Sequence, residues 1–273
     1  MSLLTLEHGP TTAPSVLFLH GAGVSSWMWT DTMRALPHLH TLAPDLPGLG
    51  RNRDVGPFEV TRAAMLLAAF IEERATDGRA HVVGHSLGGA VAAQLTAMAP
   101  EVVRSVTLIG VTARPMRFER LLVAVTVALG PLMRHPKVIA AQADALGVPM
   151  EARAQFEADQ QAMTAETLRA VMREGAGFRV PRELSEVDVP ALALVGTREA
   201  AVNRASALAL ARGMRRGRAL SVPGGGHAWL ARQPDLLVRT LLAFWSDSAL
   251  PHELVPSALD PAPRHARSSW MKH

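Results

Sequence analysis

The chain has 273 residues, enough for one large domain or two small ones with a sizeable hydrophobic core. Hydrophobic residues make up 48% of the chain and charged residues 19%, which excludes a disordered protein, and the absence of cysteine excludes disulfides, thiolate metal sites and a cysteine nucleophile. The net charge of +4 is modest for this length, and no dense Lys/Arg block occurs, so we expect no nucleic-acid partner.

Short apolar runs alternate with helical patterns along most of the chain. The predicted strands are residues 16–19, 40–43, 80–83, 103–109, 191–195 and 219–222. The predicted helices are residues 29–36, 60–75, 87–99, 203–212 and 234–245. Continuous apolar strands separated by helices are typical of a mostly parallel sheet covered on both faces. The predicted fold class is therefore α/β, with a doubly wound sheet.

The alternation breaks after the fourth of these strands. No strand pattern is found in residues 111–187, where helical stretches at 121–129 and 150–174 dominate. An insertion of this length in a compact domain is usually functional, so we predict a helical lid. The predicted organisation is a core formed by residues 1–110 and 188–248, the lid at 111–187, and a proline-rich, poorly ordered tail at 249–273.

The sequence shows no targeting signal or membrane span. The residues after Met1 lack the basic flank of a secretory signal and soon meet Glu7 and Pro10. The longest apolar run, residues 121–133, is shorter than the roughly 20 residues that a bilayer requires, and it contains a glycine and a proline. We therefore expect a cytoplasmic protein.

The sharpest local signal is the sequence Gly-His-Ser-Leu-Gly at residues 84–88. It directly follows a predicted strand and directly precedes a predicted helix, which is the context of a G-x-S-x-G nucleophile elbow. In such a turn the glycines are small because side chains would collide with neighbouring backbone. The N-terminus of the helix favours an oxyanion beside Ser86, so Ser86 is a candidate nucleophile.

A serine nucleophile needs a base, and the base needs an orienting acid. His227 lies in a glycine-rich loop after the last predicted strand, where the backbone could aim an imidazole over the sheet. Glu199 follows the preceding strand and so lies beyond its carboxyl edge, whereas Asp188 lies at the other end of that strand. The alternatives are a surface histidine and a solvated carboxylate paired with Arg198.

With these residues, the chain resembles serine hydrolases of the α/β-hydrolase fold superfamily from about Ser15 to Trp245. Besides the serine motif, His-Gly-Ala-Gly at 20–23 resembles the oxyanion loop of that family, and residues 45–51 resemble its Asp-x-x-Gly-x-Gly loop. The resemblance implies the α/β-hydrolase fold with a helical lid between two strands.

The resemblance also implies roles for individual residues. Ser86 would be the nucleophile, His227 the general base and then acid, and Glu199 the orienting carboxylate. The backbone N–H groups of Ala22 and Leu87 would form the oxyanion hole. His20 would brace its loop.

The acid position departs from the usual pattern of the family. Glu199 stands where this branch usually has aspartate, so its loop must be slightly retracted. The alternative acid position after the preceding strand is empty, because residues 109–118 contain no carboxylate. This absence favours Glu199.

Other ligand motifs are weak. Gly-Ala-Gly at 21–23 begins like a dinucleotide fingerprint, but Ser26 occupies the third glycine position. His38 and His40 have no carboxylate cluster nearby in the sequence. We therefore expect no cofactor and no metal, and a small molecule as the binding partner.

The lid is expected to shape an apolar substrate pocket. Ordinary packing of the lid on the body is the alternative for most of its apolar residues. The candidate pocket residues are Trp27, Met116, Phe118, Leu121, Leu122, Val125 and Trp229.

The predicted activity is hydrolysis of a small to medium apolar carboxylic ester through an acyl-enzyme. The same triad could act on a lactone, a thioester, an amide or a carbon–carbon bond, or form a peroxyacid. The alternatives of another class are a non-catalytic ligand receptor and an interaction subunit recruited through the proline-rich tail.

Overall fold

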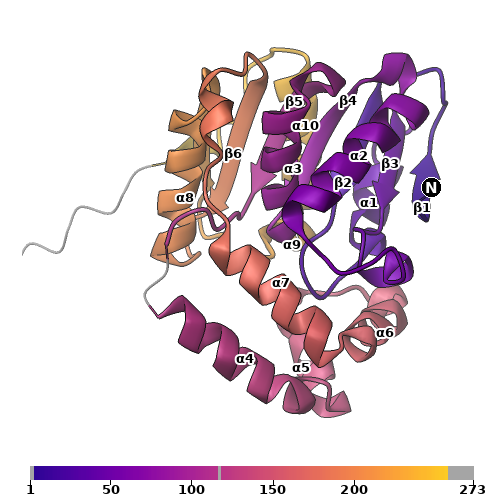
Figure 1. Cartoon of the computed structure of the whole chain (residues 1–273). Helices are drawn as coiled ribbons and strands as arrows, with labels where there is room; N and C mark the ends of the chain where they lie inside the picture. Colours follow the sequence, from indigo (N-terminus) through magenta and orange to yellow (C-terminus); the bar gives the residue numbers. More distant parts are fainter. Residues whose placement is uncertain (1–2, 116–117, 258–273) are drawn as a thin grey trace, which may run out of the picture.

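The structure is a computed structural model that describes residues 3–115 and 118–257. Within these residues, eight strands form one sheet in the order β1-β3-β2-β4-β5-β6-β7-β8 (Figure 1). Strands β2 to β7 pair in parallel, and the edge strands β1 and β8 pair antiparallel to β3 and β7. The strands are β1 (Thr5–His8), β2 (Ser15–Leu19), β3 (His40–Pro44), β4 (Ala80–His85), β5 (Val103–Ile109), β6 (Pro190–Gly196), β7 (Arg216–Val222) and β8 (Val255–Pro256).

Helices cover both faces of the sheet because its central strands are apolar on both sides. In β2, Leu17 and Leu19 pack on one face, while Val16 and Phe18 pack on the other. The first face carries α2 (Val60–Arg74), α3 (Leu87–Met98) and α8 (Ala201–Arg212). The second carries α1 (Thr30–Arg34), α9 (Trp229–Arg232) and α10 (Pro234–Trp245). The doubly wound, mostly parallel sheet is confirmed.

The helical insertion between β5 and β6 lies at one end of the sheet (Figure 1). It holds α4 (Glu119–Met133), α5 (Pro136–Leu146), α6 (Arg153–Ala162) and α7 (Ala165–Gly177). Helix α5 begins at a proline and ends at Gly147, whose φ of 71° is left-handed, and Thr164 caps α7 by accepting a hydrogen bond from the backbone N–H of Thr167. The sequence did not predict α5, and the stretch predicted at 150–174 is divided between α6 and α7.

Short 3-10 helices connect several of these elements. They are Ser26–Trp29, Gly50–Asn52, Thr76–Gly78, Pro100–Val102, Met150–Ala152 and Arg182–Ser185. In the described residues, no single helix has the length and hydropathy needed to cross a membrane. Helices α4 and α5 meet the length and hydropathy requirements only as a pair, and the pair is bent by 110° at its junction.

The edges of the sheet differ from the prediction. The sequence did not predict β1 or β8, and β8 lies inside the segment 249–273 that was expected to be a poorly ordered tail. In the structure, Leu254 is 8% exposed and packs under α10, and Val255 pairs with Ser221 of β7. Apolar packing and backbone pairing therefore order the first part of this segment. Residues 258–273 lie outside the described residues.

Candidate active site

The turn between β4 and α3 holds Ser86 in an unusual conformation. Its φ of 53° and ψ of −114° lie in a region that residues with a side chain rarely adopt. Steric limits on both sides explain the neighbouring glycines. A Cβ on Gly84 would lie 2.4 Å from the carbonyl oxygen of Gly88, and a Cβ on Gly88 would lie 2.4 Å from that of Leu19. The local sequence is therefore required by the tight approach of strand, turn and helix.

Glu199 and His227 meet beyond the carboxyl ends of β6 and β7. Nδ1 of His227 lies 2.7 Å from Oε2 of Glu199, and the backbone N–H of Gly196 donates to Oε1 of Glu199 at 2.9 Å. The Glu199 side chain is 1% exposed and that of His227 is 43% exposed. The carboxylate thus pairs with the histidine rather than with Arg198, and both of its oxygens accept a hydrogen bond.

The loops that carry these two side chains are tied together by backbone contacts. The N–H of Arg198 donates to the carbonyl of Gly225 at 2.8 Å, and a Cβ on Gly196 would lie 2.2 Å from the same oxygen. Gly110, after β5, has a φ of 63°, and a Cβ there would lie 3.0 Å from Nδ1 of His227. A side chain at Gly110 would therefore be strained by the backbone and would crowd the imidazole.

His85 is a further histidine next to the nucleophile position. Its ring lies 4.8 Å from the ring of His227, and its Nε2 donates to the backbone carbonyl of His227 at 3.1 Å. Burial first, and then the charge of His227, lower the pKa of His85 to about 3, so its ring is neutral at neutral pH. Its Nδ1 has no partner among the described residues. His85 therefore fixes the backbone of the histidine loop without carrying charge.

The loop after β2 lies against this turn. A Cβ on Gly21 would lie 3.5 Å from the Cβ of Ser86. His20 is fully buried: its Nε2 accepts from the backbone N–H of Leu46 at 2.8 Å, which leaves Nδ1 to donate to the carbonyl of Gly21. Burial lowers the pKa of His20 and keeps the ring neutral. His20 thus holds the start of the loop beside Ser86.

A second support of this loop is the buried carboxylate of Asp45. It accepts hydrogen bonds from the backbone N–H groups of Ser26 and Arg51 at 2.9 and 2.8 Å, and from Nε of Arg51. Burial alone would raise the pKa of Asp45, but the hydrogen bonds from Arg51 and Ser26 outweigh it and hold the pKa below its ordinary value. Asp45 therefore joins the two loops as an ionised group.

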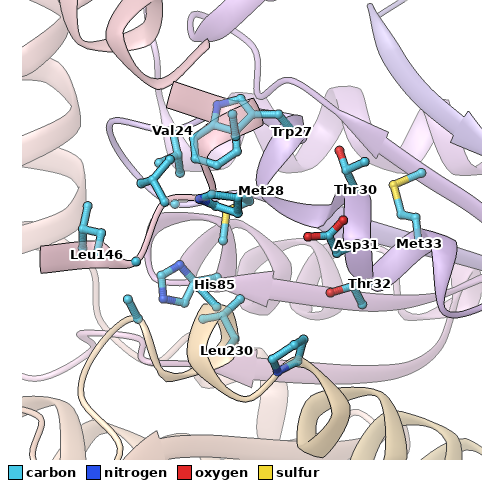
Figure 2. Close-up of a pocket in the computed structure, with 18 of the residues that line it drawn as sticks. Val24, Trp27, Met28, Thr30, Asp31, Thr32, Met33, His85, Leu146 and Leu230 are labelled. Atoms are coloured by element: carbon cyan, nitrogen blue, oxygen red, sulfur yellow. The ribbon is translucent and has the colours of Figure 1, made fainter. Parts of the chain in front are cut away.

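A cavity of about 570 Å³ opens beside Ser86. Figure 2 shows Val24, Trp27, Met28 and Leu146 gathered around the part near His85. Residues of β1 and α1, including Glu7 and several polar side chains of α1, also line it. The wall near the candidate nucleophile is largely apolar. Its members are Val24, Trp27, Met28, Leu146, Val148, Pro149 and Leu230.

The residues predicted to form the pocket are in different places. Trp27 lines the cavity, and Met116 lies outside the described residues. Trp229 is 1% exposed and packs in the core with α10, because the first turn of α9 faces the sheet. The remaining four lie at the start of α4 or on it, away from the cavity and largely exposed, because α4 packs its other face on α7. They are Phe118, Leu121, Leu122 and Val125.

The wall formed by residues 146–152 and the contacts that α6 makes with the loop after β2 were not predicted from the sequence. Gly147 and Pro149 marked this segment only as a break between helices. Nothing in the described part of the chain gathers three or more His, Asp or Glu side chains into a group that could hold a metal ion.

Comparisons with known proteins agree on the architecture. A family model described as "Alpha/beta hydrolase family" matches residues 16–240. A protein from Azorhizobium caulinodans, named as a candidate carbamate hydrolase, RutD, is 30% identical over 253 residues, which cover 87% of this chain and 92% of that protein. An esterase from Mycobacterium tuberculosis is 40% identical over 103 residues, 37% of this chain and 34% of the esterase. The solved structure of a thermophilic esterase from Thermogutta terrifontis has a TM-score of 0.72 at 20% identity and covers 90% of this chain and 93% of that one.

Proposed function

This chain belongs to the alpha/beta hydrolase family, and on that premise we propose that it is a serine hydrolase that cleaves small to medium apolar carboxylic esters through an acyl-enzyme. One observation carries the proposal. Nδ1 of His227 lies 2.7 Å from the buried carboxylate of Glu199, and His227 and Ser86 line the same cavity. This arrangement at one edge of the sheet supports the assignment of Ser86 as the nucleophile, His227 as the base and Glu199 as the orienting acid.

In the acylation step, Oγ of Ser86 attacks the carbonyl carbon of the ester while Nε2 of His227 takes its proton. Glu199 holds the imidazole with its proton on Nδ1 and stabilises the imidazolium that forms. The negative charge that develops on the carbonyl oxygen is bound by the backbone N–H groups of Leu87 and Ala22. Leu87 is the first residue of α3, so the positive end of the helix adds to this stabilisation.

In the next steps, His227 returns the proton to the leaving alcohol and then activates a water molecule. The hydroxide attacks the acyl-enzyme, the same two amides hold the second oxyanion, and the carboxylic acid leaves with Ser86 restored. The helices α4 to α7 would act as a lid over this chemistry, because residues 146–152 form one wall of the cavity.

The substrate class follows from the walls of the cavity. Its volume of about 570 Å³ lies within the range of small-molecule sites, and the apolar wall beside Ser86 favours an apolar acyl or alcohol group. A carbamate is the second candidate substrate. It is supported by the relative named for carbamate hydrolysis, which aligns over 92% of its own length.

The test is hydrolysis of p-nitrophenyl esters of increasing acyl length by the wild type and by Ser86→Ala, with circular dichroism to confirm equal folding. The proposal expects turnover that falls by about 10³-fold or more in Ser86→Ala. Activity that survives in Ser86→Ala would overturn the assignment of the nucleophile. No turnover of any ester, with turnover of a p-nitrophenyl carbamate, would favour the second candidate.

A further inference from the structure

The loop that carries Ala22 receives little support from the body of the enzyme. Its start is fixed by His20, and its end is fixed at Ser26, whose N–H donates to Asp45. Between these anchors lie Ala22, Gly23 and Val24. Gly23 has a φ of 72°, and a loop with glycines at 21 and 23 is conformationally permissive. Its geometry must therefore be set by contacts from elsewhere.

Helix α6 of the insertion supplies these contacts. Nε2 of Gln160 donates to the carbonyl oxygen of Gly23 at 2.6 Å, which is the one hydrogen bond that reaches residues 22–24 in the described part of the chain. The neighbouring Asp159 accepts a hydrogen bond from Nε1 of Trp27 at 2.8 Å. Two consecutive residues of α6 thus hold both sides of the same loop.

Apolar packing reinforces the same junction. Val24 and Trp27 pack against a small cluster built from the insertion, and the rings of Trp27 and Phe156 meet edge to face with centroids 6.3 Å apart. Figure 2 shows Val24 and Trp27 on the same side of the cavity. The loop after β2 is therefore enclosed between the sheet below and α6 above.

We propose that Gln160 and Asp159 are positioning residues that hold the Ala22 amide toward the developing oxyanion, so that the seating of α6 sets the rate of the chemical step. This inference rests on the proposed function. An oxyanion donor stabilises the transition state only when its N–H is oriented beforehand. Gln160 fixes the peptide that follows Gly23, one residue after Ala22, and Asp159 fixes the chain where it leaves the loop.

The chemistry of the Gln160 side chain allows its positioning role to be distinguished from simple packing. The group it binds is a carbonyl oxygen, which needs a donor, and a glutamate of the same size has none when ionised. Gln160→Glu and Gln160→Ala should therefore have the same effect, although one keeps the volume of the side chain and the other removes it. If α6 acted on the loop through packing alone, Gln160→Glu would be tolerated better than Gln160→Ala.

The chain offers a matched control on the same helix. Nε2 of Gln161 donates to the backbone carbonyl of Arg134 at 3.0 Å, and this bond joins α6 to the end of α4 without touching the loop after β2. Gln161→Ala and Gln161→Glu thus remove a bond of the same type from the same helix.

The experiment measures kcat and KM for p-nitrophenyl butyrate, and the inhibition constant of an alkyl trifluoromethyl ketone, whose adduct with Ser86 carries an oxyanion. Both Gln160 variants should lower kcat about ten-fold, with KM changed less than about two-fold. They should also raise the inhibition constant of the ketone about ten-fold. Both Gln161 variants should keep wild-type values. Circular dichroism and thermal melting verify that all four variants fold.

The outcomes distinguish this inference from the proposed function. Wild-type kcat in Gln160→Ala, or equal losses in the Gln160 and Gln161 variants, would overturn the positioning role while leaving the hydrolase assignment in place. A rise in KM with unchanged kcat would do the same, because it would reduce α6 to a wall of the pocket. A wild-type enzyme with no Ser86-dependent turnover would overturn both.

Discussion

The sharpest test of the site is Glu199→Gln, because the structure determines how the new amide must lie. The backbone N–H of Gly196 points at Oε1, so the single oxygen of glutamine must stay there to accept it. The amide nitrogen then faces Nδ1 of His227, where Oε2 stood at 2.7 Å. The reversed amide would set two buried donors against each other, at a cost of about 1–3 kcal/mol.

With the amide nitrogen facing it, Nδ1 of His227 can only accept. The ring proton moves to Nε2, and the imidazole can no longer take a proton from Ser86. Trapping the base in this tautomer is expected to lower kcat by about 10³- to 10⁴-fold, or about 4–5.5 kcal/mol of transition-state stabilisation. Glutamine matches glutamate in shape, so the melting temperature should change little.

The assay is kcat and KM on p-nitrophenyl butyrate, with the melting temperature followed by circular dichroism. Glu73→Gln is the matched control, since it removes the same charge from an exposed position on α2. A Glu199→Gln enzyme that keeps more than about a third of wild-type kcat would refute the reasoning. It would mean that the carboxylate supports the fold of the loop and has no part in orienting the base.

Three further predictions concern stability. Gly88→Ala should destabilise the protein by about 3 kcal/mol, since its Cβ would lie 2.4 Å from the backbone oxygen of Leu19; a melting curve like that of the wild type would contradict this. Burial, and then Arg104, lower the pKa of His81 from 6.5 to about 4, so the unfolded chain binds a proton that the folded chain does not. The free energy of unfolding should therefore fall as the pH drops from about 6.5 to about 4, and urea titrations should show a shallower fall in His81→Gln. Burial raises the pKa of Asp159 despite its hydrogen bond to Trp27, so the free energy of unfolding should fall as the pH rises from the ordinary pKa of an aspartate through this raised pKa. Asp159→Asn should therefore have a larger free energy of unfolding than the wild type at pH 7. A smaller value for the variant in urea titrations would refute this.

Local sequence determined the six parallel strands β2 to β7 and the turn that carries Ser86. A strand such as β2, apolar on both faces, has few places other than the middle of a covered sheet, so its neighbours need not be known. The glycines at 84 and 88 are required by backbone atoms within a few residues or in the adjacent strand. Chain order also predicted that Glu199 and His227 follow two successive strands, and the structure pairs these strands and brings the two side chains together.

Tertiary structure alone decided what the apolar segments face. The composition of the apolar run 121–133 is equally compatible with a pocket wall and with a surface helix. The packing of α4 on α7 decides between them, because it turns Leu121 and Val125 outward. The edge strand β8 likewise depends on a partner in β7. The bonds from α6 to the loop after β2 join residues 132 and 137 positions apart, Trp27 with Asp159 and Gly23 with Gln160. Periodicity and steric limits act between neighbours and can be read from the sequence, whereas a contact across such a distance exists only once the chain has folded.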